Sequence, residues 1–200
     1  MEVLLQRNFT EFYGLTFPSI VDWFFDTDEK YFEIEDSNTK ELVLYTKPGN
    51  GTACISNPIG FQVKIINYDK FISSLPNFFQ DGRKRSDLIL TCAKTNTFVL
   101  GELKDSKNIK KHRKKAKKQL LETLLTLIAV PEIFGYIKSA SVNKCCYFNK
   151  QARVSTSLNA VSAFNRLPNS FVNGFKINLP EFEANNFEFW EFFGSQTLIL

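Results

Sequence analysis

Two carboxylates and one lysine on neighbouring predicted strands are the residues of this chain best suited to chemistry. Asp87 opens the apolar segment Ser86–Cys92, and Glu102 and Lys104 end a second apolar segment, Thr97–Lys104. Both segments are rich in the branched and aliphatic side chains that favour strands. The short polar stretch between them predicts a β-hairpin.

The register of this hairpin decides whether the three side chains meet. With a two-residue turn at positions 95–96, Asp87 faces Lys104 and Ile89 faces Glu102. Residues opposite each other, and residues two apart on one strand, share a face of the sheet. The sequence therefore predicts that Asp87, Glu102 and Lys104 converge on one face, near one end of the pair.

Two carboxylates held together on rigid strands repel each other and are costly to bury. A Mg²⁺ ion resolves this, because it prefers oxygen ligands, binds one or two carboxylates and keeps waters and phosphate oxygens. We expect Asp87 and Glu102 to bind the metal, with the backbone carbonyl of Leu103 as a further ligand. Lys104 would orient or help to deprotonate a metal-bound water and offset the charge on a phosphate. The alternative is a cross-strand salt bridge between Asp87 and Lys104, with Glu102 in solvent.

The pattern Ser86-Asp87, fourteen residues, then Glu102-Leu103-Lys104 resembles the PD-(D/E)xK nuclease superfamily, which has the restriction-endonuclease-like fold. The resemblance covers about residues 86–129. It implies an α/β fold (α+β with a mixed sheet) with an α-β-β-β-α-β core and peripheral elements, dependence on Mg²⁺ (Mn²⁺ as substitute) and cleavage of nucleic acid. We expect DNA as the substrate, with RNA as the alternative. Ser86 stands where the family's eponymous proline would be.

The resemblance also implies two further contributions to the site. Gln119 resembles a glutamine that several branches of the superfamily place near the metal, and we include it among the catalytic candidates. An acidic residue from an early helix often joins the site as well. Glu11, Asp22 and Asp26 are the candidates here, and the sequence leaves the choice among them open.

One short segment carries the whole positive excess of the chain. The formal net charge is +4, yet nine Lys or Arg residues lie between positions 104 and 118, against one acid. They fall on a predicted helix, about residues 108–129, whose apolar residues repeat with helical spacing. A local basic patch favours a polyanion, because phosphate binding releases counterions. The candidate nucleic-acid-binding residues are Lys107, Lys110, Lys111, Arg113, Lys114 and Lys117.

The remaining pattern predicts a meander of strands flanked by helices. We expect strands at residues 41–47, 52–57, 61–67 and 136–148, a short helix at 68–75 and a hairpin at 171–177. We expect helices at 8–28, interrupted at Pro18, and at 155–164, with Pro131 ending the helix that starts near residue 108. The apolar residues 197–200 are expected to form a final strand or a partner contact.

Composition and length limit the remaining classes of protein. The 200 residues suit a single nuclease-like domain, with a core at about 8–148 and a C-terminal extension at 149–200. We expect a cytoplasmic protein with no membrane segment, because there is no signal-like N-terminus and no long apolar run. The four cysteines, including the adjacent Cys145 and Cys146, are expected to be reduced thiols without a metal or redox role.

The sequence thus predicts a metal-dependent endonuclease, with restriction, repair or defence as settings suggested by fold analogy alone. Two alternatives remain. One is a non-catalytic nucleic-acid-binding or scaffold subunit on the same fold. The other is an unrelated interaction protein whose apolar C-terminal end contacts a partner, and the same end would suit a homodimer.

Overall fold

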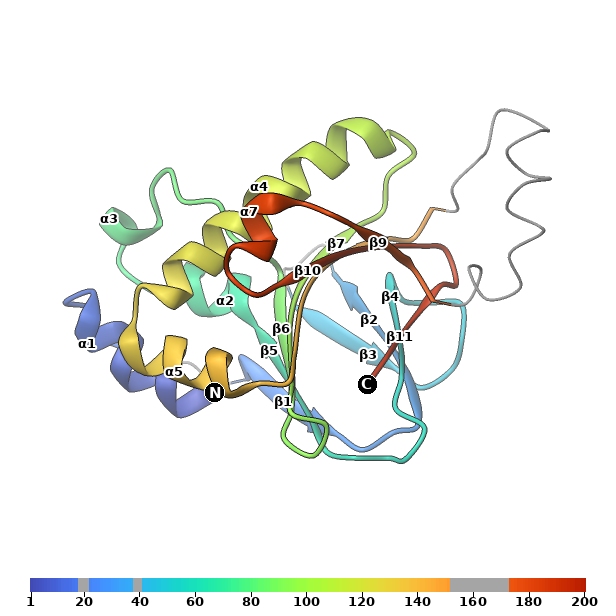
Figure 1. Cartoon of the computed structure of the whole chain (residues 1–200), viewed down its shortest axis with the longest axis horizontal. Helices are drawn as coiled ribbons and strands as arrows, with labels where there is room; N and C mark the ends of the chain where they lie inside the picture. Colours follow the sequence, from blue (N-terminus) through green and yellow to red (C-terminus); the bar gives the residue numbers. More distant parts are fainter. Residues whose placement is uncertain (18–21, 38–40, 152–172) are drawn as a thin grey trace.

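Two mixed β-sheets and a layer of helices build the protein (Figure 1). The computed structural model describes residues 1–17, 22–37, 41–151 and 173–200. The α/β prediction, as an α+β chain with mixed sheets, is confirmed. Within these ranges no single helix is long and apolar enough to cross a membrane. The helices α4 (Ile109–Ile128) and α5 (Pro131–Ser139) reach that length and composition only as a pair bent by 110°.

The larger sheet contains the strands that carry the predicted site. Its seven strands have the order β1-β5-β6-β7-β8-β10-β9. The strands β5, β6 and β7 form an antiparallel meander, and β8 and β10 continue the sheet parallel to β7. The bounds in chain order are β1 Phe24–Thr27, β5 Val63–Asn67, β6 Leu88–Cys92, β7 Thr97–Lys104, β8 Val142–Asn149, β9 Phe175–Ile177 and β10 Glu188–Phe193.

The smaller sheet has four strands in the order β11-β4-β2-β3. The C-terminal strand β11 lies parallel to β4, so the predicted final strand is confirmed. The bounds are β2 Tyr31–Asp36, β3 Leu42–Tyr45, β4 Ala53–Ser56 and β11 Thr197–Ile199. Strands that follow Asn149 in the chain therefore belong to both sheets.

Helices cover one face of the larger sheet and the smaller sheet covers the other (Figure 1). On β7, Phe98 and Leu100 pack against the helices, whereas Val99 and Leu103 pack toward the smaller sheet. This alternation follows from the two-residue period of a strand. The helical segments are η1 Leu4–Phe9, α1 Thr10–Phe12, α2 Tyr68–Ser73, α3 Asn77–Gln80, α4 Ile109–Ile128, α5 Pro131–Ser139 and α7 Pro180–Glu183.

The predicted register of the β6–β7 hairpin is wrong by two residues. Cys92 pairs with Thr97 and Leu88 with Gly101, so four residues form the turn instead of two. The backbone of Asn96 adopts φ 50°, a left-handed conformation that Asn tolerates in turns. A shift of two residues keeps every side chain on its predicted face, whereas a shift of one would have reversed them all.

Two other predicted elements are wrong in part. The helix expected over residues 8–28 ends at Phe12, and Phe24–Thr27 forms β1. The strand expected at 136–148 begins only at Val142, because a helix that starts at Pro131, α5, extends to Ser139. Proline is tolerated there since its missing N–H has no partner within the helix. Pro131 therefore begins a helix as well as following the end of α4.

Several smaller predictions are tested only in part. The helix expected at 155–164 lies outside the described residues. Within the predicted hairpin at 171–177, the described strand β9 pairs with β10, which follows it in the chain. Pro18 is likewise outside the described residues. Cys145 and Cys146 are buried free thiols on β8, as predicted.

Candidate active site

Asp87, Glu102 and Lys104 meet at one end of β6 and β7. The Lys104 ammonium lies 3.6 Å from Asp87 Oδ2 and forms an ion pair with Glu102 Oε1. Glu102 and Lys104 are two residues apart on β7 and face the helices, as Leu100 does. The corrected register places Asp87 at the level of Glu102, just beyond the last ladder pair of the hairpin.

Backbone groups of β7 and of the start of α2 form hydrogen bonds with Asp87. Its carboxylate accepts a 2.6 Å hydrogen bond from the Leu103 amide, and its own amide donates to the Gly101 carbonyl at 3.1 Å. Its carbonyl accepts from the amides of Tyr68 and Asp69 at the start of α2, at 2.9 and 3.3 Å. Leu103 thus serves the site through its N–H, and a metal contact through its carbonyl stays a prediction.

Burial of the cluster strongly perturbs its acids. The exposed fractions are 0% for Glu102 and 8% for Asp87. Burial raises the pKa of Asp87 to about 6, although the charge of Lys104 opposes the shift. Burial, and then the charge of Asp87, raise the pKa of Glu102 well above its usual range. Burial lowers the pKa of Lys104, but the two carboxylates outweigh it and the net shift is upward.

The donor set fits a hard divalent cation. Glu102 Oε2 is buried and has no hydrogen-bond partner among the described residues. The Lys104 ammonium lies beside both carboxylates, and burial disfavours the ionised form of each. No group of three or more His, Cys, Asp or Glu side chains suited to a metal occurs in the described part of the chain. Two protein carboxylates with waters and phosphate oxygens completing the shell would suit Mg²⁺.

The simple salt-bridge alternative accounts for only part of this geometry. It expects Glu102 in solvent, but Glu102 is fully buried and is itself ion-paired with Lys104. A buried carboxylate is costly unless it is well paired.

Apart from Glu102, the acids whose charges act on Asp87 differ from those proposed from the sequence. Glu11 is exposed and pairs with Arg7, Asp26 pairs with Lys64, and Asp22 is exposed. None of these three is among the groups that shift the pKa of Asp87, whereas Asp36 and Asp69 raise it. A sequence signal existed for Asp69, which follows directly after the strand next to β6. Asp36 comes from the other sheet, and no local pattern points to it.

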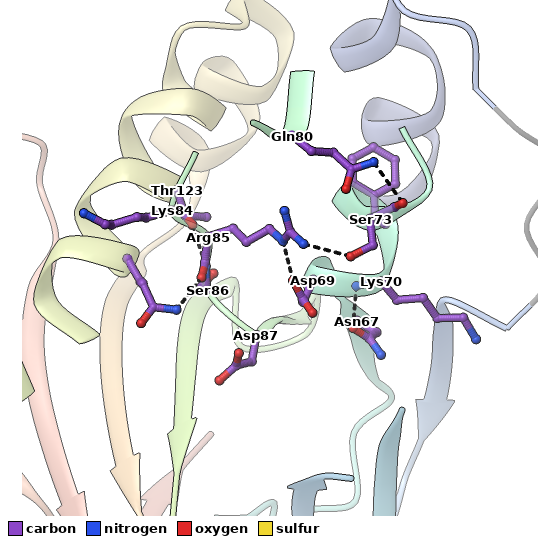
Figure 2. A network of polar contacts seen from close by, with 12 residues as sticks. Asn67, Asp69, Lys70, Ser73, Gln80, Lys84, Arg85, Ser86, Asp87 and Thr123 are labelled. Carbon is purple, nitrogen blue, oxygen red and sulfur yellow. Dashed lines mark hydrogen bonds and ion pairs between the residues drawn. The ribbon is translucent and has the colours of Figure 1, made fainter. Parts of the chain in front are cut away.

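The helix α4 fixes the segment that leads into Asp87 (Figure 2). Gln119 Nε2 donates to the Arg85 carbonyl at 2.8 Å, and Thr123 Oγ1 accepts from the Ser86 amide at 2.8 Å. The Arg85 side chain extends the other way, to Asp69 and to Ser73 Oγ. Gln119 therefore contacts the backbone beside the carboxylate cluster, and its Oε1 is buried without a partner among the described residues.

The six candidate nucleic-acid-binding residues fall into two groups. Four are exposed, namely Lys107, Lys110, Lys111 and Lys114. Lys117 is half-buried, with its ammonium 5.4 Å from the centre of the Phe189 ring, and Arg113 forms an ion pair with Glu191. Sequence reasoning left out Lys115, whose charge lowers the pKa of Glu102 and which is therefore electrostatically linked to the cluster.

Comparisons of the chain with protein-family models, with curated proteins and with solved structures found no match. The resemblance to the PD-(D/E)xK nucleases therefore depends on the residues and on their placement.

Proposed function

We propose that the protein is a metal-dependent nuclease that hydrolyses phosphodiester bonds of DNA. The observation that carries the proposal is the buried Glu102 carboxylate, with one oxygen unpartnered among the described residues, beside Asp87 and Lys104. The β5–β6–β7 meander followed by α4 and the parallel strand β8 is consistent with the strand and helix order of the PD-(D/E)xK superfamily. The basic first half of α4 supports a polyanionic substrate.

The residues of the cluster have distinct roles in this proposal. Asp87 and Glu102 would hold Mg²⁺, which when bound acts as a Lewis acid and lowers the pKa of water. The Leu103 amide keeps the Asp87 carboxylate oriented. Lys104 carries a proton in the metal-free cluster, because its pKa is raised. It would hydrogen-bond the attacking water or a phosphate oxygen and offset the negative charge that develops there.

The second candidate function is a non-catalytic nucleic-acid-binding subunit. One observation favours it, namely that Lys104 already neutralises the fully buried Glu102 without a metal. A protein of this kind would bind DNA with a steep dependence on salt and would cleave it with no divalent ion.

Cleavage assays test the proposal directly. Supercoiled plasmid, single-stranded DNA and RNA are incubated with the protein in Mg²⁺, in Mn²⁺ and in EDTA. We expect cleavage of DNA with either metal and none in EDTA. Glu102→Gln, Asp87→Asn and Lys104→Met should each lower the rate about 100-fold or more. Asp105→Asn, which changes a neighbouring acid outside the cluster, should cleave at the wild-type rate.

The outcomes separate the two candidate functions. Cleavage that persists in Glu102→Gln would mean a contaminant or a different site. Binding of DNA without cleavage in any metal would select the non-catalytic subunit.

A further inference from the structure

A row of buried polar residues continues from Glu102 across the larger sheet. Glu102 on β7 pairs with Tyr147 on β8, and Tyr147 pairs with Glu191 on β10. Paired residues on adjacent strands share a face of the sheet, so all three lie on the face covered by helices. Each has an exposed fraction of 0%.

This row contains polar atoms that the described residues leave without hydrogen bonds. They are Glu102 Oε2, the Tyr147 hydroxyl and Glu191 Oε2. Buried polar atoms in native proteins are nearly always paired, so an unpaired one needs an explanation, such as a catalytic role or a bound water or ion. Burial raises the pKa of Tyr147, the charge of Glu191 adds to this shift and that of Lys104 opposes it, so the row and the carboxylate cluster are electrostatically linked.

Glu191 forms an ion pair with Arg113 on α4. The ion pair uses Arg113 Nε and Glu191 Oε1. The two terminal nitrogens of the guanidinium have no hydrogen-bond partner among the described residues, and 31% of the side chain is exposed. One edge of the guanidinium is therefore fixed by a buried carboxylate, and the side chain is partly open to solvent.

We propose that Arg113 is a fixed phosphate-binding residue beside the carboxylate cluster, and that Glu191 positions it. The ligand would be a phosphodiester of the same strand, next to the one that is cleaved. The proposal rests on the proposed function for the identity of that strand. A guanidinium suits the role because its donors match two phosphate oxygens at once, which an ammonium on a flexible stem does not do.

Binding measured without metal tests the role of Arg113 independently of catalysis. A fluorescein-labelled single-stranded DNA of 20 nucleotides is titrated with the protein in EDTA. Arg113→Ala should weaken binding about tenfold or more. Lys110→Ala, an exposed base on the same helix, should weaken it only about twofold to threefold. Arg113→Lys should bind nearly as poorly as Arg113→Ala, because it keeps the charge but loses the fixed fork.

Glu191→Gln separates positioning from simple electrostatics. Removal of a negative charge should by itself favour a polyanion, so a general charge effect predicts tighter binding. Positioning predicts the opposite, namely binding about threefold to tenfold weaker at every salt concentration. Tyr147→Phe removes a hydroxyl that has no hydrogen-bond partner among the described residues, so it should leave binding unchanged.

A double variant keeps the test valid if single changes unfold the protein. Arg113→Met with Glu191→Met replaces the ion pair by apolar side chains of similar length, an exchange that proteins often tolerate. It should melt cooperatively and bind as poorly as Arg113→Ala.

The results distinguish this inference from the proposed function. Wild-type binding by Arg113→Lys, tighter binding by Glu191→Gln, or no binding by the wild-type protein would each overturn the phosphate site. Absence of cleavage, with Arg113-dependent binding intact, would overturn only the nuclease.

Discussion

The Asp87 carboxyl is a buried acid whose raised pKa makes its ionised form costly to the fold. Its pKa of about 6 lies above its ordinary value of 3.8, because burial outweighs the charge of Lys104. The folded state therefore binds more protons than the unfolded state between these values. The free energy of unfolding must then fall as the pH rises from about 4 to about 6, by roughly 3 kcal/mol from this group.

Asp87→Asn should remove this cost in metal-free protein. Relative to the wild-type protein, the free energy of unfolding of Asp87→Asn should rise by roughly 3 kcal/mol between pH 4 and pH 7. Urea unfolding in EDTA at several pH values measures it, with the exposed Asp81→Asn as control. A constant difference across this range would mean that Asp87 ionises normally in the folded state.

A bound divalent metal should favour the ionised carboxylates and so raise the free energy of unfolding. Mg²⁺ or Mn²⁺ at 100 times its dissociation constant should stabilise the wild-type protein by about 2.7 kcal/mol. Asp87→Asn and Glu102→Gln should lose this stabilisation, whereas Asp105→Asn should keep it. Thermal melting with and without the metal gives the comparison. An equal shift in all four proteins would point to a site away from the cluster.

At the scale of elements, α4 holds the residues that lead into Asp87. The Ser86 amide donates to Thr123 Oγ1, and Ser86 is fully buried. Thr123→Val keeps the shape of the side chain but leaves this amide without its acceptor. We expect a loss of about 1–3 kcal/mol in the free energy of unfolding.

Thr126→Val is the matched control on the same helix. Thr126 Oγ1 donates only to the Glu122 carbonyl within α4, and that carbonyl belongs to the helix itself. The Thr126→Val substitution should lower the free energy of unfolding, measured in urea, by less than about 1 kcal/mol. If Thr123→Val also weakens the Mg²⁺ stabilisation, then α4 positions the cluster. An unchanged metal effect would limit α4 to stability alone.

At the scale of the whole molecule, the C-terminal strand closes the core between the two sheets. Leu198 on β11 is 1% exposed and packs in that core, whereas Ile199 points outward with 48% exposed. Leu198→Ala should therefore cost about 2–5 kcal/mol in the free energy of unfolding, and Ile199→Ala less than 1 kcal/mol. Equal costs would mean that β11 does not pack on the sheets in solution.

Local pattern predicted the elements that carry their own signal. The strand Thr97–Lys104 and the helix near residues 108–129 were predicted almost to the residue, because strand alternation and helical spacing are properties of the segment itself. The face shared by Glu102 and Lys104 was predictable for the same reason, and it was unaffected by the two-residue error in register. The helix Pro131–Ser139 was missed because proline signals both the end and the start of helices.

The sequence by itself thus determined that Glu102 and Lys104 share one face of β7, and it pointed to Asp87 as their neighbour. Only the tertiary structure decided what surrounds them: Asp69 from α2, Asp36 from the other sheet, and the row from Glu102 through Tyr147 to Glu191. Glu102 on β7 lies 45 positions before its partner Tyr147 on β8, and Tyr147 lies 44 positions before its partner Glu191 on β10. No local period in the sequence encodes such contacts. Burial follows from the same packing, so the raised pKa of Asp87 had no counterpart in the sequence.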